Sequence, residues 1–147
     1  MRWRLMDKVT GFEPWHAISG RKAVSVEEYY LLERLGREGV LPESLVLGCC
    51  AELTRWLIAV SSSFRASGLL VGVEQFRFGQ AARMGDLLEV DARVADRGEQ
   101  SLTAECRVRG DSGEIASGRL AFTFVPAVQL FEPDELQGLW LEVHGEP

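Results

Sequence analysis

The sequence contains no asparagine, two lysines and three cysteines in 147 residues. Without asparagine it has no acceptor for N-glycosylation. Cys49, Cys50 and Cys106 are odd in number, and none of them forms the Cys-x-x-Cys spacing of a zinc site. We therefore expect three small buried hydrophobic residues in a reducing cytosol, without disulfides, metal or other cofactors.

Long apolar runs and an excess of basic residues are also missing. The first 14 residues carry five charges and no apolar run of signal-peptide length. No apolar stretch reaches the roughly 18 residues of a membrane helix. The net charge of −6 provides no basic surface for nucleic acid or an anionic membrane. We expect a soluble, cytoplasmic protein that binds neither.

The remaining composition is that of an ordinary globular protein. Hydrophobic residues make up 46% and charged residues 26% of the chain, and we find no internal repeat, linker or low-complexity segment. The length suits one domain, which can bury a core without disulfide or metal staples. We expect a single domain over residues 1–147.

The clearest element is a helix from Pro42 to about Val60. Pro42 suits the first helical turn, and Glu43 favours the positive end of the helix dipole. Apolar residues recur along it at spacings of three and four and fill most of its circumference. A helix that is apolar over most of its surface is normally buried.

The segments on either side of this helix are predicted to be mostly strands. Two strands precede it, Trp3–Val9, which Gly11 and Pro14 break, and Ala17–Val26. A capping box at residues 25–28 predicts a short helix through residues 29–32. The tail from Pro133 onward is expected to form one or two helical turns.

Four strands are expected between Leu69 and Val125. Residues 88–94, 102–108 and 120–124 alternate between apolar and polar, as in an antiparallel sheet with one packed face and one wet face. Turn residues gather at 96–99 and 110–113. The run at residues 70–73 is apolar throughout and predicts a more central strand. These elements predict an α+β hotdog fold, a curved antiparallel sheet of about six strands wrapped around one long central helix.

Several segments resemble the β-hydroxyacyl-acyl carrier protein dehydratases of bacterial fatty-acid synthesis, which belong to the hotdog superfamily. Residues 75–78, Gln-Phe-Arg-Phe, and 84–88, Met-Gly-Asp-Leu-Leu, resemble that family's Lys-Val-Arg-Phe and Pro-Gly-Asp-x-Leu. Residues 39–42, Gly-Val-Leu-Pro, resemble the Pro-Val-Met-Pro that opens its central helix. Further likeness lies at residues 5–9, 22–25 and 28–30. The resemblance covers nearly the whole chain and implies the hotdog fold.

The two catalytic positions of that family are substituted. The resemblance places a histidine before the helix, where this chain has Arg34 or Glu33, depending on the direction of counting. It places a carboxylate six residues after Pro42, where this chain has Gly48. Dehydration needs a base within reach of the α-proton, and an arginine stays protonated.

Two carboxylates could replace the missing groups. Glu52 lies one helical turn beyond Gly48 on the same face, and Glu33 could present a second carboxylate from the preceding loop. Some hotdog thioesterases resemble this arrangement, with a helix carboxylate that activates water. The alternative interpretation is that Glu52 reaches solvent or pairs with Arg55 or Arg34.

The resemblance also implies a thioester-binding site at the start of the helix. The amides of Glu43, Ser44 and Leu45 would face the thioester carbonyl, although Glu43 replaces the glycine that normally allows close approach. The acyl tail would lie between helix and sheet, and the residues that could line it, all of which could equally be core, are Leu47, Cys50, Leu53, Trp56 and Phe78. The residues that could dock an acidic acyl carrier protein are Arg34, Arg37 and Arg83. His16 and His144 are expected on the surface, and Asp86 in a turn.

Two functions follow. The first is a dehydratase-like protein that binds acyl thioesters of the 3-hydroxyacyl-carrier protein type in fatty-acid or polyketide-type metabolism. It would be either inactive alone or a subunit of a heteromeric dehydratase. The second is a divergent active enzyme, a dehydratase (a lyase) or a thioesterase, that uses Glu52 or Glu33. The expected partners are acyl carrier protein or a coenzyme A thioester. A second hotdog subunit, identical or not, is expected to form a dimer that buries the edge strand.

Overall fold

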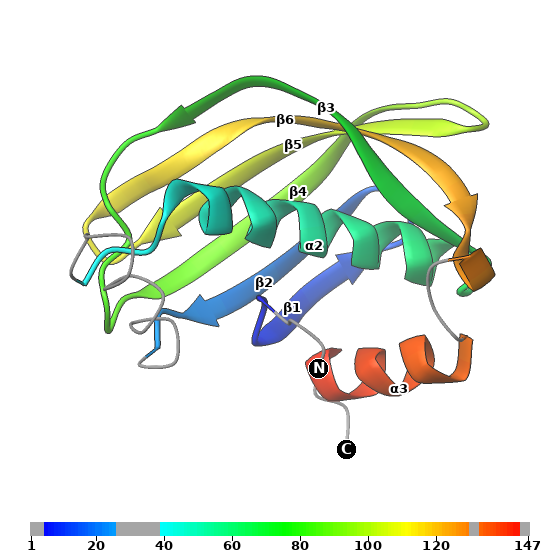
Figure 1. The fold of residues 1–147 in the computed structure, drawn as a ribbon, viewed down its shortest axis with the longest axis horizontal. Coiled ribbons are helices and arrows are strands. Elements are labelled where there is room, and N and C mark those ends of the chain that lie inside the picture. Colours follow the sequence, from blue (N-terminus) through cyan, green and yellow to red (C-terminus); the bar gives the residue numbers. More distant parts are fainter. Residues whose placement is uncertain (1–4, 26–38, 130–132, 145–147) are drawn as a thin grey trace.

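The computed structural model describes residues 5–25, 39–129 and 133–144 (Figure 1). Its elements, in chain order, are β1 (Lys8–Glu13), β2 (Ala17–Ala23), α2 (Glu43–Ser61), β3 (Ala66–Phe78), β4 (Leu87–Arg97), β5 (Ser101–Gly110), β6 (Gly113–Pro126), a 3-10 turn (Ala127–Gln129) and α3 (Pro133–His144).

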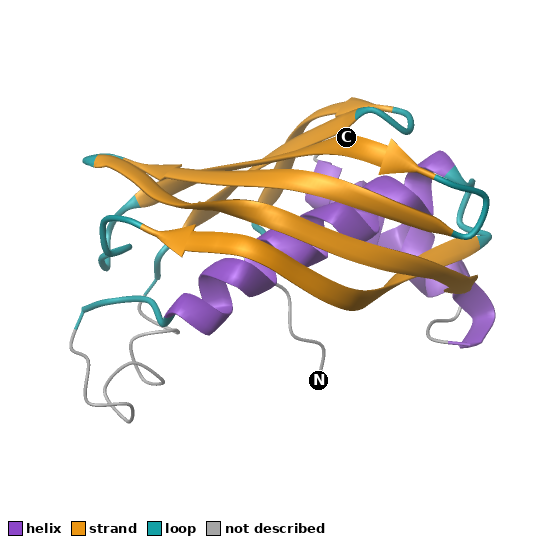
Figure 2. Cartoon of the chain, turned by 90° about the horizontal axis from the view of Figure 1, so that it is seen from above, coloured by secondary structure: helices purple, strands orange, loops and turns teal. Residues whose placement is uncertain are grey.

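The six strands form one antiparallel sheet in the order β1-β2-β4-β5-β6-β3. Figures 1 and 2 show α2 lying along one face of this curved sheet. The helix begins one residue after Pro42 and ends at Ser61, and ten of its 19 residues are buried. The predicted α+β arrangement, with a sheet of six strands around one long apolar helix, is confirmed.

The alternating segments behave as their pattern predicts. Side chains of β4 and β5 that point to α2 are buried, while their sequence neighbours on the other face are mostly exposed. The predicted turns at residues 96–99 and 110–113 connect β4 to β5 and β5 to β6. The apolar residues on the inner face of these two strands are Leu88, Val90, Ala92, Leu102, Ala104, Cys106 and Val108.

The boundaries of the first two strands differ from the prediction. β1 begins at Lys8 rather than Trp3, and it continues through Gly11, which was expected to break it. The pairing of β1 with β2 shifts between Val9 and Gly11, so Thr10 is the extra residue of a bulge and Gly11 pairs with Ser19 just after it. β2 ends at Ala23, three residues before the predicted end. The helix predicted at residues 29–32 lies outside the described residues.

The prediction that residues 70–73 form a more central strand is wrong. They belong to β3, which pairs with β6 alone and forms one edge of the sheet. Leu69, Val71 and Val73 are 47%, 61% and 47% exposed. A run of apolar residues predicts that a strand is buried. The pattern does not indicate whether the burying surface belongs to the same chain or to another one.

The C-terminal helix α3 is longer than the expected one or two turns, with 12 residues. Trp140 packs against Trp56 of α2 at 5.6 Å between ring centroids and against Phe12 of β1 at 5.8 Å. α3 therefore covers the C-terminal half of α2 on the side that the sheet leaves open. By length and composition alone α2 could cross a membrane, but it packs in the core as the central helix of a soluble protein does.

We predict that Gly118→Ala destabilises the fold. A Cβ atom at Gly118 would lie 2.5 Å from the Cα of Phe76, a main-chain atom of β3 that cannot move aside easily. The expected loss is about 1–3 kcal/mol in the free energy of unfolding, measured by urea denaturation. Gly72→Ala is the matched control, because its Cβ would meet the Cβ of Ala121 at an ordinary 3.5 Å. Equal stability of the two variants would contradict the prediction.

Candidate functional site at the start of the central helix

The start of α2 is held against the loop between β3 and β4. Val40 forms an isolated antiparallel bridge with Arg83. The amide of Leu41 donates to the carbonyl of Ala82 at 2.7 Å, and the amide of Met84 donates to the carbonyl of Gly39 at 2.8 Å. These main-chain bonds position the first turn of the helix. We call this turn, together with the residues that lead into it, the helix mouth (residues 39–45).

Asp86 shapes the loop next to the mouth. Its Oδ2 accepts a hydrogen bond from the amide of Arg83 at 2.9 Å, and Gly85 has the positive φ of 94° that this turn needs. Val24, just beyond β2, exchanges hydrogen bonds with Gly85 and Asp86 at 3.0 Å each. The turn role that the sequence indicated for Asp86 is thus what the structure shows.

The three amides predicted to face a thioester are not equivalent. The amide of Leu45 already donates to the carbonyl of Pro42 at 2.9 Å. Pro42 supplies no side-chain cap, and the described part of the chain offers no acceptor to the amide of Ser44, an exposed residue. Ser44 is therefore the predicted donor best placed to meet a ligand, with the half-buried Glu43 beside it.

The N-terminal segment of the chain covers the helix face on which chemistry was expected. The two oxygens of Glu52 accept hydrogen bonds from the amides of Leu5 and Met6, at 3.0 and 2.6 Å. The ammonium group of Lys22, a side chain only 1% exposed, donates to the carbonyl of Leu5 at 2.7 Å. A Cβ at Gly48 would lie 2.8 Å from Leu5 Cδ1, so the side chain of Leu5 occupies the space beside that glycine.

This arrangement gives Glu52 a structural role. Two main-chain donors that would otherwise be partly buried without acceptors are satisfied by its carboxylate. Arg55, one of its expected partners, uses its Nε to donate to the carbonyl of Gly68 at 3.1 Å. Burial lowers the pKa of Arg55, and the negative charge of Glu52 opposes that shift.

Neither histidine of the chain lies at the mouth. His16 sits in the turn between β1 and β2, with Nδ1 3.0 Å from the carbonyl oxygen of Pro14. That turn is at the opposite end of β2 from Val24, roughly 25 Å away at the usual rise of a strand. His144 stacks on Trp140 of α3 at 4.7 Å.

The other predicted site residues are spread along α2 and β3. Leu47 is half-buried near the mouth, whereas Trp56 is buried about 14 Å farther along the helix, against α3. Phe78 is 44% exposed at the end of β3. Arg83 is exposed at the rim of the mouth. Glu33, Arg34 and Arg37 lie outside the described residues.

The cysteines are buried, as predicted, and all three are free thiols. A hydrogen bond with Cys106 and burial raise the pKa of the Cys50 thiol well above its usual value. A thiol held in this neutral form is a poor nucleophile. No group of three or more metal-ligating side chains occurs within the described ranges.

Comparisons with known proteins agree with the fold. A sequence model of the Thioesterase superfamily matches residues 50–117, from within α2 into β6. The crystal structure of a hot-dog-like protein from Thermanaerovibrio acidaminovorans superposes with a TM-score of 0.67 at 16% identity and covers 92% of this chain and 96% of that one. This chain has the hotdog fold.

Other hotdog proteins resemble it in sequence or in structure. The 3-hydroxyacyl-acyl-carrier-protein dehydratase FabZ of Thioalkalivibrio sulfidiphilus is 29% identical over 116 residues, which are 73% of this chain and 78% of that protein. The structure of smu.793 from Streptococcus mutans bound to acetyl CoA has a TM-score of 0.67 at 15% identity, and the match covers 86% of this chain and 94% of that one.

Sequence reasoning missed the N-terminal segment as part of this site. Lysine is almost never fully buried unless it is paired, so its residue type gave no reason to expect Lys22 beneath the segment. The one available signal was the resemblance of residues 5–9 and 22–25 to two segments of the same dehydratase family. The structure brings these two segments together.

We predict that Glu52→Ala lowers the free energy of unfolding by about 1–3 kcal/mol, because the amides of Leu5 and Met6 lose their acceptors. Glu52→Gln, which keeps one carbonyl acceptor, should lose less. Glu99→Ala is the control, since Glu99 is exposed in the turn between β4 and β5, and it should change stability by less than about 0.5 kcal/mol. Urea unfolding measures all three, and a Glu52→Ala variant as stable as the control would show that the segment is held by other contacts.

Proposed function

We propose that this hotdog protein binds acyl thioesters at the helix mouth and does not dehydrate them by itself. The observation that carries the proposal is the side chain of Leu5 beside Gly48, where the resemblance expects a catalytic carboxylate. Both histidines of the chain lie far from the mouth. Dehydration without a base near the α-proton would be slow.

Binding is supported by groups that remain at the mouth. The open amide of Ser44 and the positive end of the α2 dipole favour a thioester carbonyl. The exposed Arg83 stands at the rim, where the phosphates of coenzyme A or the acidic surface of an acyl carrier protein would arrive. Acetyl CoA is bound in the similar structure from Streptococcus mutans, and the dehydratase relatives are named for acyl carrier protein substrates.

A second hotdog chain is proposed to pair along β3. This edge strand is 13 residues long and exposes Leu69, Val71 and Val73. Exposed apolar edge strands aggregate unless something covers them. A second copy, or a related subunit that retains the histidine, would continue the sheet, and a related subunit would also complete a dehydratase site in fatty-acid or polyketide-type metabolism in the cytoplasm.

A divergent active enzyme is the second candidate. The match to the Thioesterase superfamily favours it, and either Glu52 or Glu33 would then activate water or move a proton. Glu52 could act only by releasing the amides of Leu5 and Met6.

The proposal predicts that Glu43→Gly binds a thioester more tightly than the unchanged protein. The glycine removes the side chain beside the amide of Ser44 and lets a carbonyl approach the main chain. Isothermal titration with 3-hydroxybutyryl-coenzyme A should show a lower Kd by roughly tenfold. Glu43→Gln separates size from charge, because it keeps the side chain and should leave the Kd nearly unchanged. If all three proteins fail to bind, no thioester site exists at the mouth.

Turnover distinguishes the two candidates. We expect the purified protein neither to hydrate crotonyl-coenzyme A, the reverse of dehydration, nor to release free thiol from butyryl-coenzyme A. Clear turnover that Glu52→Gln or Glu33→Gln abolishes, with folding checked by circular dichroism, would establish the second candidate. Activity that appears only after co-expression with a histidine-containing hotdog subunit would support the heteromeric form of the first.

A further inference from the structure

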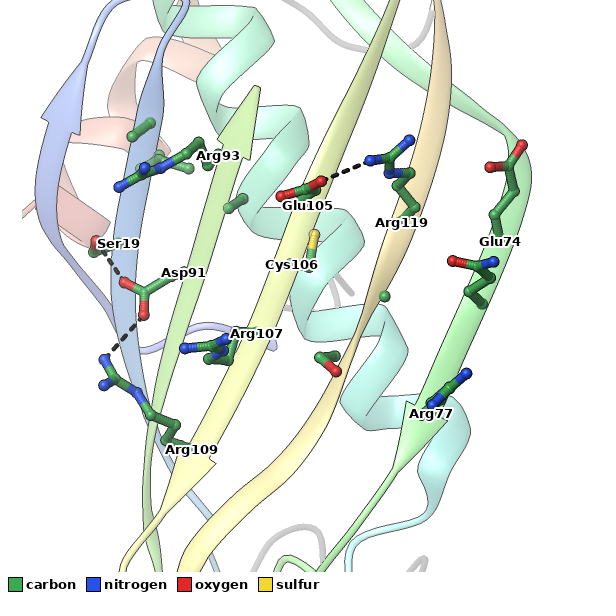
Figure 3. Close-up of a pocket in the computed structure, with 16 residues that line it drawn as sticks. Ser19, Glu74, Arg77, Asp91, Arg93, Glu105, Cys106, Arg107, Arg109 and Arg119 are labelled. Carbon is green, nitrogen blue, oxygen red and sulfur yellow. Dashed lines mark hydrogen bonds and ion pairs between the residues drawn. The ribbon is translucent and has the colours of Figure 1, made fainter. Parts of the chain in front are cut away.

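Two cysteines from different elements meet between the central helix and the sheet. Cys50 lies on α2 and Cys106 on β5, and both side chains are buried. The thiol of Cys50 donates a hydrogen bond to the sulfur of Cys106. Figure 3 shows Cys106 on its strand, with α2 passing behind the sheet. The proposed function makes no use of the contact between these two thiols.

Thr54 defines where Cys106 meets the helix. It lies one helical turn after Cys50, on the same face of α2. Its hydroxyl donates to the carbonyl of Cys50 at 2.8 Å, and the same oxygen lies 3.8 Å from Sγ of Cys106. Cys106 therefore packs against the single turn of α2 that begins at Cys50.

The neighbours of Cys106 in the sheet are small. Cys106 pairs with Ala92 of β4 and with Gly118 of β6. Neither neighbour has a side chain larger than a methyl group, so nothing bulky from the adjacent strands at this row separates Cys106 from α2. A disulfide joins residues whose Cα atoms are about 4.4–6.8 Å apart, and small neighbours favour such a close approach of helix and strand.

The two thiols differ in how easily they ionise. The hydrogen bond to Cys106 and burial raise the pKa of the Cys50 thiol. The hydrogen bond from Cys50 lowers the pKa of the Cys106 thiol, against the opposite effect of burial. The thiolate is the form that reacts with oxidants. Cys106 is therefore the thiol that reacts first, and Cys50 is the thiol beside it.

Cys106 is also the cysteine nearest to solvent. Its side chain is 3% exposed, whereas those of Cys49 and Cys50 are 0% exposed. Cys106 belongs to the lining of a hollow of about 750 Å³ on the face of the sheet away from α2 (Figure 3). A small uncharged oxidant therefore reaches Cys106 before the other two thiols.

We propose that Cys50 and Cys106 are a redox-sensitive pair, which hydrogen peroxide converts into a reversible disulfide between α2 and β5. The sulfur of Cys106 attacks the peroxide, the O–O bond breaks, one water leaves and Cys106 becomes a sulfenic acid. The sulfur of Cys50 then attacks that sulfur and the S–O bond breaks. The oxygen takes the proton of Cys50 and leaves as a second water. In total the two thiols lose two electrons and two protons, and the peroxide is reduced to two waters.

The bond ties the central helix to the middle of the sheet. It closes a loop over residues 50–106, and a cross-link over such a loop stabilises the fold by restricting the unfolded chain. Disulfides in a reducing compartment are usually transient and respond to oxidants, so the free thiols of this structure are the resting state. The pair contacts no residue of the helix mouth that the proposed function uses, so its test is independent of thioester binding.

Cys49 provides a control within the chain. Cys49 and Cys50 are adjacent, so an unfolded chain closes nearly the same loop from either one to Cys106, whereas the fold selects Cys50. Cys49→Ala and Cys50→Ala each keep one of the two. With hydrogen peroxide, folded Cys49→Ala should form the disulfide as fast as the unchanged protein, and folded Cys50→Ala at least about tenfold more slowly. In concentrated urea the two variants should form it equally fast.

Mass spectrometry after trypsin digestion measures the bond, which joins peptide 38–55 to peptide 98–107 and is released by dithiothreitol. Circular dichroism checks folding. If Cys50→Ala does not fold, the linked peptide from folded Cys49→Ala decides, because Cys50 is then the only cysteine left in peptide 38–55. No linked peptide from the folded protein, or equal rates in the two folded variants, would overturn the proposal.

Urea unfolding provides a second readout. The oxidised protein should unfold at a higher urea concentration than the reduced protein, and dithiothreitol should reverse the shift. A midpoint at or below that of the reduced protein would show that the bond does not fit the native core, and this result would also overturn the proposal.

Discussion

The rest of this structure depends on removing α2 from water. The helix is apolar around most of its circumference, and each aliphatic side chain that it buries contributes about 1.5–3 kcal/mol. One sheet covers only one side of such a helix. The chain therefore adds two further covers, the N-terminal segment at residues 5–7 near the mouth and α3 over the C-terminal half. At the mouth, the loop between β3 and β4 meets the start of the helix through main-chain hydrogen bonds.

The N-terminal cover also explains the composition of the candidate site. A main-chain segment that crosses a helix brings amides and carbonyls into a half-buried place, and these groups need partners. Glu52 accepts from the amides of Leu5 and Met6, and Lys22 donates to the carbonyl of Leu5. Gly48 leaves room for the side chain of Leu5. The glycine at position 48 and the carboxylate at position 52 are therefore parts of a single packing arrangement.

The features that could be predicted from the sequence are those that periodicity determines. The helix bounds agree within one residue, and the alternating segments became β4, β5 and β6 with the expected inner faces. Periodicity indicates which side chains of a segment are suited to burial, but not which element buries them. It therefore predicted a central strand at residues 70–73, although these residues lie in β3 at an exposed edge of the sheet. It also could not reveal that Glu52 binds main-chain amides, because a contact across 46 or 47 residues leaves no local pattern. The catalytic role suggested for Glu52 stays a prediction.

The two faces of the sheet are under different constraints. The inner face must be apolar because it is buried against α2, so its residue types follow from the fold. A face that only meets water needs polar side chains, and the sign of each charge is free to vary. Cross-strand pairing accounts for Arg119, which forms an ion pair with Glu105, and equally for Arg93, which lies directly opposite Glu105 in the register of β4 and β5. The charges on the side of the sheet away from α2 therefore follow from pairing between neighbouring strands, whereas the apolar residues on the other side follow from the burial of α2.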